Sequence, residues 1–429
     1  MTIPNIANGA SGSSVRALLN LAITQVLNVR EAPYNAKGDG STDDTVAIQA
    51  AINDAGAVHG KVIIPATLNG YKISNSLVYT SPQTCLAIPA YVTLSGTTAG
   101  FVNGVMLNCA TGTTGFAIRE QTIAEQGNSN GATSIVVANM QINGVATMAG
   151  GINLGNQGVA LSTGGVIENV MVSGTGYLAT LTTNSTTAAA SSTLHFASGA
   201  GAIQVGSLIL DLSNSNSTAS YNAIPWNTVV VSSTATSVTM SNPVPVNATV
   251  GSGDVIAFVA PAYNLNANAC CFINIACDYA GIGLYTNGGG TSAYNFVSLV
   301  GCYLYNLCIN DPGNWFFGVD IENANNGTYP MMSLSKPTAF YGLSMVNQVS
   351  SGTKPCMVTL AAGLPGGIYM NSVAAYSTSG GTFTHTILPQ DYTGDGVGTG
   401  GFTEYSYQNS VTDLKYFQDA GNGTITQHN

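Results

Sequence analysis

The chain has 429 residues, of which 45% are hydrophobic and only 7% are charged, against roughly 25% charged residues in ordinary domains. Disordered chains are poor in apolar residues and rich in net charge, so this composition argues against disorder. The net charge is −10, and no Lys or Arg occurs between Arg119 and Lys336. Nucleic acid and anionic membranes are therefore not expected as partners, because binding to either needs a basic surface.

No targeting or membrane signal is predicted. Met1–Ser14 lacks the basic start and apolar run of a secretory signal, and no stretch approaches the ~18 apolar residues of a membrane span. The eight cysteines are scattered without the spacing of zinc ligands, so we expect buried, reduced thiols. This pattern fits a protein that folds in a cytoplasm and acts outside the cell after release without a signal peptide.

Two helices are predicted near the N-terminus. Apolar residues at helical spacing indicate a short helix over Val15–Val26. Further on, Lys37–Gly40 has the composition of a turn, and Ser41 and Asp44 have the spacing of a capping box. The helix that follows ends at Gly56, and its apolar face consists of Ala47, Ile48, Ala51, Ile52 and Ala55.

The run Tyr34–Ile52, with short strands predicted after it at Val62–Ile64 and Tyr71–Ile73, resembles the opening of the pectate-lyase-like β-helix superfamily. Members of that family usually have Gly where Asn35 stands, and Asn also adopts positive φ. Val15–Arg30 is similar to the lead-in of phage and prophage tailspikes. The resemblance implies an all-β, right-handed parallel β-helix capped by a short N-terminal helix. It also implies a homotrimer that binds bacterial polysaccharide and contacts other virion tail proteins.

Strands of one pattern recur along the rest of the chain, at Val136–Asn143, Val166–Ser173, Phe272–Cys277, Phe296–Gly301 and Phe317–Asn323. Alignment of Phe272 with Phe296 gives an offset of 24 residues, and alignment of Leu299 with Ile321 gives 22. Periods of roughly 20–30 residues predict a solenoid, in which each coil buries its apolar face only by stacking on its neighbours.

The chain divides into five predicted parts. A lead-in with the first helix covers 1–30, and the β-helix occupies 31–181 and 261–405. Between these two stretches, residues 182–260 show short strands separated by Asn, Ser and Gly, which predicts a small inserted β-domain. Residues 406–429 form a polar C-terminal tail or a small closing element.

A pair of carboxylates suggests where chemistry occurs. Asp320 and Glu322 lie two residues apart in a predicted strand, so their side chains share a face. We expect Phe317, Val319 and Ile321 to point into the core and the two carboxylates to point outward. Two neighbouring carboxylates can divide into acid and base for glycoside hydrolysis. The alternative is an ordinary solvated face of the β-helix.

Five further residues are candidates for the same site. Asp278 is expected one coil earlier on the same flank, as a third catalytic carboxylate, although a structural turn residue is the simpler interpretation. Asp311, Trp315 and Tyr329 lie near the pair in sequence and Tyr279 follows Asp278, so we expect these four residues to bind substrate, the aromatic ones by stacking their faces on sugar rings.

No cofactor or metal site is predicted, and a calcium loop at Asp391 and Asp395 stays open as an alternative with an incomplete ligand set. The histidine and Arg-x-Lys motifs of polygalacturonases and the Asp-Pro-His-Glu motif of alginate epimerases are absent. A lyase acting on uronates needs basic groups, which the stretch between Arg119 and Lys336 lacks, so it ranks below hydrolysis of a neutral glycan.

The resemblance and the carboxylates together predict a phage-type tailspike that binds and hydrolyses a bacterial surface polysaccharide. The first alternative is a non-catalytic receptor-binding or structural spike that uses the inserted domain for recognition. The second alternative is a bacterial polysaccharide lyase or epimerase on the same fold.

Overall fold

The computed structural model describes most of the chain from Val26 onward, and it begins with strand β1 (Val26–Asn28). The helix predicted over Val15–Val26 lies outside the described residues except for Val26. The described ranges are 26–57, 60–79, 85–86, 105–120, 136–155, 162–213, 223–287, 291–323, 329, 331–336, 338–347, 353–360, 368–377, 382–389, 405–410, 413–419 and 425–428.

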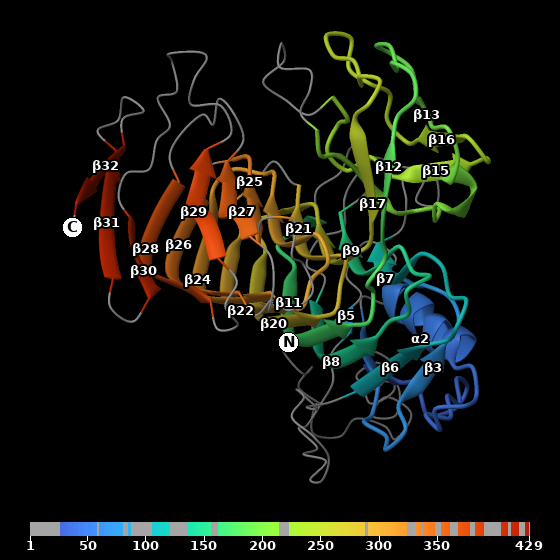
Figure 1. Ribbon diagram of the computed structural model, residues 1–429. Coiled ribbons are helices and arrows are strands. Elements are labelled where there is room, and N and C mark those ends of the chain that lie inside the picture. Colours follow the sequence, from blue (N-terminus) through green and yellow to red (C-terminus); the bar gives the residue numbers. More distant parts are fainter. Residues whose placement is uncertain are drawn as a thin grey trace.

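Helix α2 (Thr45–Ala57) lies at the N-terminal end of the body, in blue in Figure 1, and confirms the second predicted helix. Asp43 caps it, because its Oδ1 accepts a hydrogen bond of 3.0 Å from the N–H of Thr45. The capping box predicted from Ser41 is not formed, since the Ser41 hydroxyl donates to Asp39 instead. The side chains of α2 that are fully buried against the first coils are Ile48, Ala51, Ile52 and Ala55.

Two long parallel sheets form the body, and their strands alternate along the chain. Sheet A contains β1, β2 (Lys61–Ile63), β3 (Tyr71–Ile73), β5 (Cys85–Leu86), β6 (Val105–Cys109), β8 (Val136–Asn143), β11 (Val166–Ser173), β20 (Cys271–Asp278), β22 (Ala293–Val300), β24 (Asn314–Asn323), β26 (Thr338–Asn347) and β28 (Ile368–Ser377). Sheet B contains β4 (Leu77–Tyr79), β7 (Phe116–Glu120), β9 (Gly150–Leu154), β18 (Pro261–Leu265), β21 (Ile282–Thr286), β23 (Tyr305–Ile309), β25 (Met332–Leu334), β27 (Thr353–Leu360) and β29 (Thr382–Pro389).

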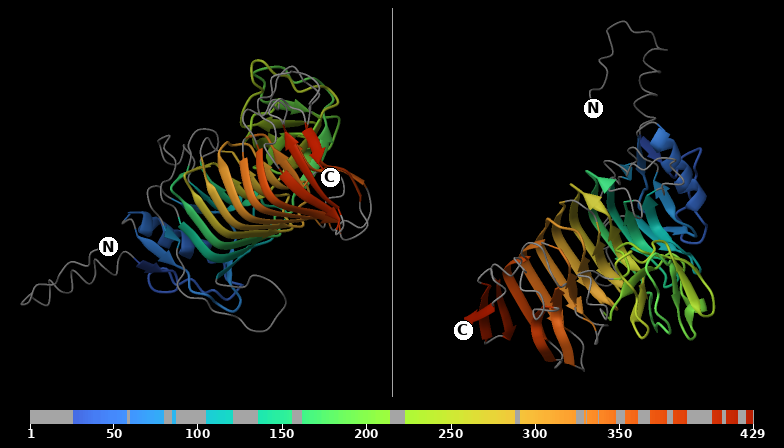
Figure 2. Two further views of the ribbon diagram at one scale, coloured as in Figure 1. Left: turned by 90° about the vertical axis from the view of Figure 1, so that its left-hand side faces the viewer. Right: turned by 90° about the horizontal axis from the view of Figure 1, so that it is seen from above.

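Figure 2 shows these strands stacked as successive rungs from the blue end of the molecule to the red end. A short pair, β10 (Ser162–Thr163) and β19 (Ala267–Asn268), is also parallel. The molecule is the right-handed parallel β-helix expected from the sequence.

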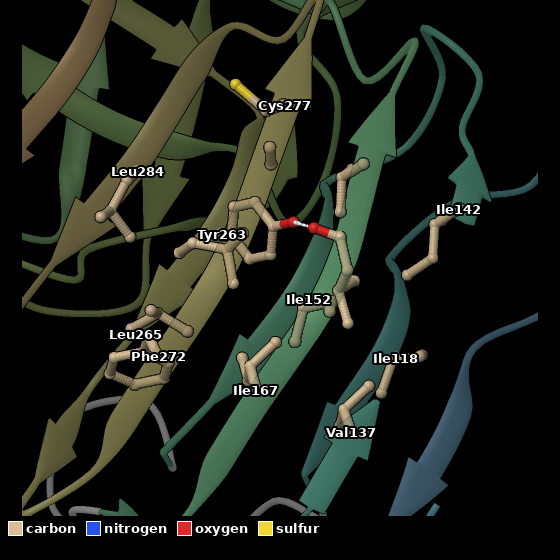
Figure 3. Close-up of a cluster of buried hydrophobic side chains, with 14 of the residues drawn as sticks. Ile118, Val137, Ile142, Ile152, Ile167, Tyr263, Leu265, Phe272, Cys277 and Leu284 are labelled. Atoms are coloured by element: carbon tan, nitrogen blue, oxygen red, sulfur yellow. Dashed lines mark hydrogen bonds between the residues drawn. The ribbon is translucent and has the colours of Figure 1, made fainter. Parts of the chain in front are cut away.

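The core lies between the two sheets and consists of aliphatic and aromatic side chains from successive coils (Figure 3). One buried polar group joins the two sheets: the hydroxyl of Tyr263 on β18 donates to the carbonyl oxygens of Val170 (2.7 Å) and Ala276 (2.8 Å). Burial of such a hydroxyl is tolerated because it is hydrogen-bonded.

The register corrects one predicted alignment. Phe272 pairs with Tyr294, 22 positions away, and not with Phe296. Leu299 pairs with Ile321, as predicted. The rings inside the helix follow this register and stack in a continuous row from Phe272 through Tyr294 and Phe316 to Phe340, with centroid separations of 4.7, 4.3 and 4.9 Å. The first two steps are 22 residues long and the last is 24.

The strands of sheet A share an irregularity near their middle. One residue in each of six strands has φ between 50° and 75°, and the ladder pairing omits that residue. Because of this left-handed residue, the alternation of inward and outward side chains shifts by one position after it, in the same way on every one of these strands. The residues are Asn139, Asn169, Asn274, Phe296, Gly318 and Gly342, on β8, β11, β20, β22, β24 and β26.

An antiparallel domain interrupts the β-helix between β11 and β18. It contains β12 (Leu178–Thr182), β13 (Thr193–His195), the 3-10 turn η1 (Ala200–Ala202), β14 (Leu208–Asp211), β15 (Val230–Ser233), β16 (Ser237–Met240) and β17 (Val255–Val259). β17 pairs with β12 and β14, and β16 pairs with β13 and β15. This domain is the insertion expected from the sequence, and the predicted boundary at 182 falls on the last residue of β12.

The inserted domain packs on the outer face of sheet B (Figure 1). Ile282 and Tyr285 of β21 share an apolar cluster with Leu210 and Val259 of the domain. The oxygen of the Tyr285 hydroxyl also accepts a hydrogen bond of 3.1 Å from the N–H of Asn227. The insertion therefore covers the part of sheet B around β21 and β23.

The C-terminal segment forms a three-stranded antiparallel sheet of β30 (Tyr405–Ser410), β31 (Asp413–Asp419) and β32 (Ile425–His428). Among the described residues, six cysteines are free thiols, five of them buried. No helix in the described ranges is long and apolar enough to cross a membrane.

Candidate functional site

The outer face of β24 carries two of the predicted catalytic residues. Asp320 and Glu322 are partly exposed, while Val319 and Ile321 are buried, as predicted. The prediction for Phe317 is wrong: this ring points outward with 36% of its surface exposed, and Phe316 points inward. The cause is Gly318, whose φ of 65° places two successive residues on the outer side.

The register defines the surroundings of each carboxylate. Asp320 lies between Ser298 on β22 and Ser344 on β26. Glu322 lies between Val300 and Val346 on the same two strands. Each carboxylate therefore has short, uncharged neighbours on both sides.

Asp278 lies in the same row of the sheet as Glu322, with only Val300 between them. Two strand spacings separate the backbones of Asp278 and Glu322 by roughly 10 Å, and two residues along β24 separate Asp320 from Glu322 by roughly 7 Å. The prediction that Asp278 lies on the same flank agrees with this register. Burial raises the pKa of the Asp278 carboxyl, and a hydrogen bond from the Tyr279 N–H partly opposes the shift.

Exposed aromatic side chains occupy the other half of this face. Trp315 is 46% exposed and Phe296 is 68% exposed. The rings of Phe317 and Tyr341 stack at 5.1 Å with 10° between their planes, and the Trp315 and Tyr341 rings lie 6.2 Å apart. Trp315 pairs with Ala293 and Ala339 on the neighbouring strands, so no large side chain flanks it at its own level.

Two of the predicted substrate-binding residues lie elsewhere. Asp311 is 1% exposed, and its Oδ1 accepts hydrogen bonds from Thr286 and Asn314, so it stabilises a turn and is not available to a ligand. Tyr329 packs against the apolar cluster between sheet B and the inserted domain, which includes Trp226. Both predictions rested on closeness in sequence to Asp320, and the coil carries these residues away from sheet A. We leave both out of the site.

Tyr279 directly follows Asp278, the last residue of β20, and is 49% exposed. It has a φ of 55°, and its N–H donates to the carbonyl oxygen of Val300. Gly174 and Gly301 make the same backbone hydrogen bond one coil before and after it. A tyrosine therefore occupies a left-handed position where the neighbouring coils have glycine.

Sequence reasoning missed Phe296, Phe317 and Tyr341 as surface residues. A glycine directly after Phe317 and another directly after Tyr341 were the available signal, because glycine within a strand often marks a bulge. Phe296 gave no such signal, since the residue with positive φ is the phenylalanine itself.

The four strands that carry the site, β20, β22, β24 and β26, contain the three carboxylates and no Lys or Arg. Within the described ranges, no group of three or more His, Cys, Asp or Glu side chains could hold a metal ion. Asp391 and Asp395, the residues of the alternative calcium loop, lie outside these ranges.

No protein-family model and no curated protein matches the chain. Among solved structures, ORF18 of Geobacillus virus E2 is 12% identical, with a TM-score of 0.43 over 99% of this chain and 80% of its own. The enzymatically active domain of tailspike protein 2 of bacteriophage CBA120 is 10% identical, with a TM-score of 0.37 over 90% of this chain and 47% of its own. An endo-xylogalacturonan hydrolase from Aspergillus tubingensis is 10% identical, with a TM-score of 0.32 over 90% of this chain and all of its own.

The similar structures thus include phage tailspikes and polysaccharide-degrading β-helix enzymes, the family that Tyr34–Ile52 resembles. Because the TM-scores are below 0.5, the assignment of the fold rests on the strand pairing of this chain.

Proposed function

We propose that this protein is a tailspike-type depolymerase that binds a bacterial surface polysaccharide on the outer face of sheet A and hydrolyses it there. The observation that carries the proposal is the presence of three carboxylates and a group of exposed aromatic rings on one face of neighbouring strands. Aromatic faces offer sugars a stacking surface, and paired carboxylates supply the proton transfers of glycoside hydrolysis.

Asp278 and Glu322 suit the two roles of an inverting hydrolase. The raised pKa of Asp278 favours its protonated form, so it donates a proton to the glycosidic oxygen as the bond to the leaving sugar breaks. Glu322 accepts a proton from a water molecule, whose oxygen attacks the anomeric carbon. Inverting enzymes hold their carboxyl groups roughly 6.5–9.5 Å apart to admit this water, and side chains on backbones roughly 10 Å apart can meet that range.

Asp320 is the alternative partner of Glu322 and lies beside it on β24. In the proposed arrangement it accepts hydrogen bonds from sugar hydroxyls next to the cleaved bond. Variants at Asp278 and Asp320 distinguish these roles, because loss of the acid lowers turnover most for substrates with poor leaving groups.

The proposal extends to assembly and location. We infer a homotrimer in a virion tail, in contact with other tail proteins, and the resemblance of Val15–Arg30 to tailspike lead-in segments supports this inference. Sedimentation velocity of the full chain tests it, and a stable monomer contradicts it.

The function is tested by incubating the protein with a panel of purified capsular polysaccharides and O-antigens and measuring new reducing ends. Hydrolysis releases reducing ends without ultraviolet absorbance, whereas a lyase also produces absorbing unsaturated uronates. A polysaccharide that is bound tightly but not cut favours the non-catalytic receptor-binding spike, for which the exposed aromatic rings are the supporting observation.

A further inference from the structure

Phe296 occupies a backbone position that suits it poorly. Its φ is 57°, a left-handed conformation that bulky residues rarely adopt. At the equivalent position the three preceding strands β8, β11 and β20 have asparagine and the next two strands, β24 and β26, have glycine. These are the two residue types that tolerate this conformation best. These equivalents are Asn139, Asn169, Asn274, Gly318 and Gly342.

Phe296 also ends a row of side-chain hydrogen bonds. The Nδ2 atom of Asn169 donates to Oδ1 of Asn139 at 2.9 Å, and Nδ2 of Asn274 donates to Oδ1 of Asn169 at 2.9 Å. An asparagine at position 296 could donate to Asn274 in the same way, and phenylalanine cannot.

Packing does not compensate for the backbone conformation of Phe296, because 68% of the residue is exposed. Its ring lies over Gly318, where a Cβ atom would approach Phe296 Cδ1 to 3.2 Å. Gly318 is two residues before Asp320, so the ring stands roughly 7 Å along the strand from that carboxylate. Strained residues that gain no packing cluster at functional sites.

We propose that Phe296 is a sugar-binding residue, whose ring, with Phe317, stacks on a neutral pyranose unit next to the carboxylates. The inference rests on the proposed function and specifies the substrate class. A neutral sugar fits because the face offers apolar rings and carboxylates, and β20 to β26 carry no Lys or Arg that could pair with a uronate.

The matched variants are Phe296→Asn and Ala190→Gly. Phe296→Asn removes the ring, relieves the left-handed strain and extends the row of asparagine hydrogen bonds. Ala190 is also left-handed, with φ 62°, but it lies exposed in the inserted domain, so Ala190→Gly relieves similar strain away from sheet A. A second variant, Phe296→Gly, also removes the ring and relieves the strain, but it adds no hydrogen bond to the row of asparagines.

The readouts are the melting temperature at one scan rate and retention in affinity electrophoresis with those panel polysaccharides that retain the wild-type protein. We expect Phe296→Asn to melt roughly 1–2 °C higher and to bind at least about tenfold more weakly. Ala190→Gly should also melt higher and should bind as the wild type does. Polysaccharides that retain the wild type should be free of uronic acid.

Unchanged retention of both Phe296 variants overturns the inference while the proposed function stands. An altered sedimentation coefficient with unchanged retention also overturns it, because the ring would then be a subunit contact. Wild-type protein that no polysaccharide of the panel retains overturns the proposed function, and the inference with it.

Discussion

The side-chain amide of Asn274 donates a hydrogen bond of 2.9 Å to the amide oxygen of Asn169, 105 positions earlier in the chain. The whole inserted domain lies between these two residues in sequence, yet β11 and β20 pair as adjacent strands. The β-helix therefore continues across the insertion in unbroken register, and the Asn169–Asn274 contact marks the junction.

Replacing Asn169 tests this junction. Asn169→Ala removes hydrogen bonds to both neighbouring asparagines and leaves a left-handed residue without a suitable side chain. We expect a loss of about 2–4 kcal/mol in the free energy of unfolding, measured by denaturant titration. Glycine adopts positive φ without strain, so Asn169→Gly should lose less free energy of unfolding than Asn169→Ala. Equal losses would show that backbone conformation contributes nothing at this position.

The architecture could be predicted from sequence because its signals are local. The turn and helix of Tyr34–Ile52 and the apolar alternation of β8 and β11 each lie within a short segment, so they were visible without the fold. The register could not be predicted in this way. Phe272 and Phe296 begin similar stretches of sequence, but the left-handed residue within each strand shifts the side-chain alternation, so the two residues are not equivalent in the structure. The same shift hid the outward position of Phe317.

From the sequence, the positions of site residues could be predicted only within a single strand. Asp320 and Glu322 share β24, so the two-residue period sufficed to place them on one face. Asp311 and Tyr329 are near in sequence but follow the coil away from sheet A, Asp311 to a buried turn and Tyr329 to a partly buried position beside the inserted domain. Only the stacking of strands brings Asp278 into the row of Glu322.

The N-terminal turn depends on Asp44. Its carboxylate accepts hydrogen bonds from the backbone N–H groups of Lys37 (2.6 Å) and Gly38 (2.9 Å), and the residue is 2% exposed. Asp44→Ala leaves two N–H groups without their acceptor, so we expect a loss of about 2–4 kcal/mol in the free energy of unfolding. Asp54→Ala is the control: Asp54 lies on the exposed surface of the helix and accepts a solvent-exposed hydrogen bond from the Tyr34 hydroxyl, so its loss should change stability by less than about 1 kcal/mol. A loss at Asp44 no larger than at Asp54 would contradict this role.

Asp43 should make the N-terminal end sensitive to acid. Burial alone would raise the pKa of Asp43, but hydrogen bonds from Ser74 and Thr45 outweigh it and lower the pKa. A carboxyl group whose folded pKa is depressed contributes stability above its unfolded pKa, about 4, and loses it as the pH falls through the folded value. Thermal unfolding measured from about pH 6 down to about pH 2 should show this loss of stability in the wild type. The loss over the same range should be smaller in Asp43→Asn. Parallel curves would rule out this contribution.

The inserted domain should unfold together with the β-helix. Tyr285 is fully buried between them, and its hydroxyl oxygen accepts the N–H of Asn227. Tyr285→Phe should reduce the free energy of unfolding by about 1–2 kcal/mol without dividing the transition, as measured by calorimetry. Tyr303→Phe, at a partly exposed ring, should have little effect. Two separate transitions in the wild type would contradict this coupling.

The most direct test of the account is the release of reducing ends from a cleavable polysaccharide by Glu322→Gln and Asp278→Asn, compared with the wild type and Glu168→Gln. Glu168 is a carboxylate on β11, on the same outer face of sheet A but in the row of Ile273 and Asn295 and not in the row of Asp278 and Glu322. We expect the two site variants to lose about 10²–10⁴-fold in turnover while they still bind the polysaccharide, and Glu168→Gln to be unaffected. Full turnover by Glu322→Gln and Asp278→Asn would contradict the proposed catalytic face.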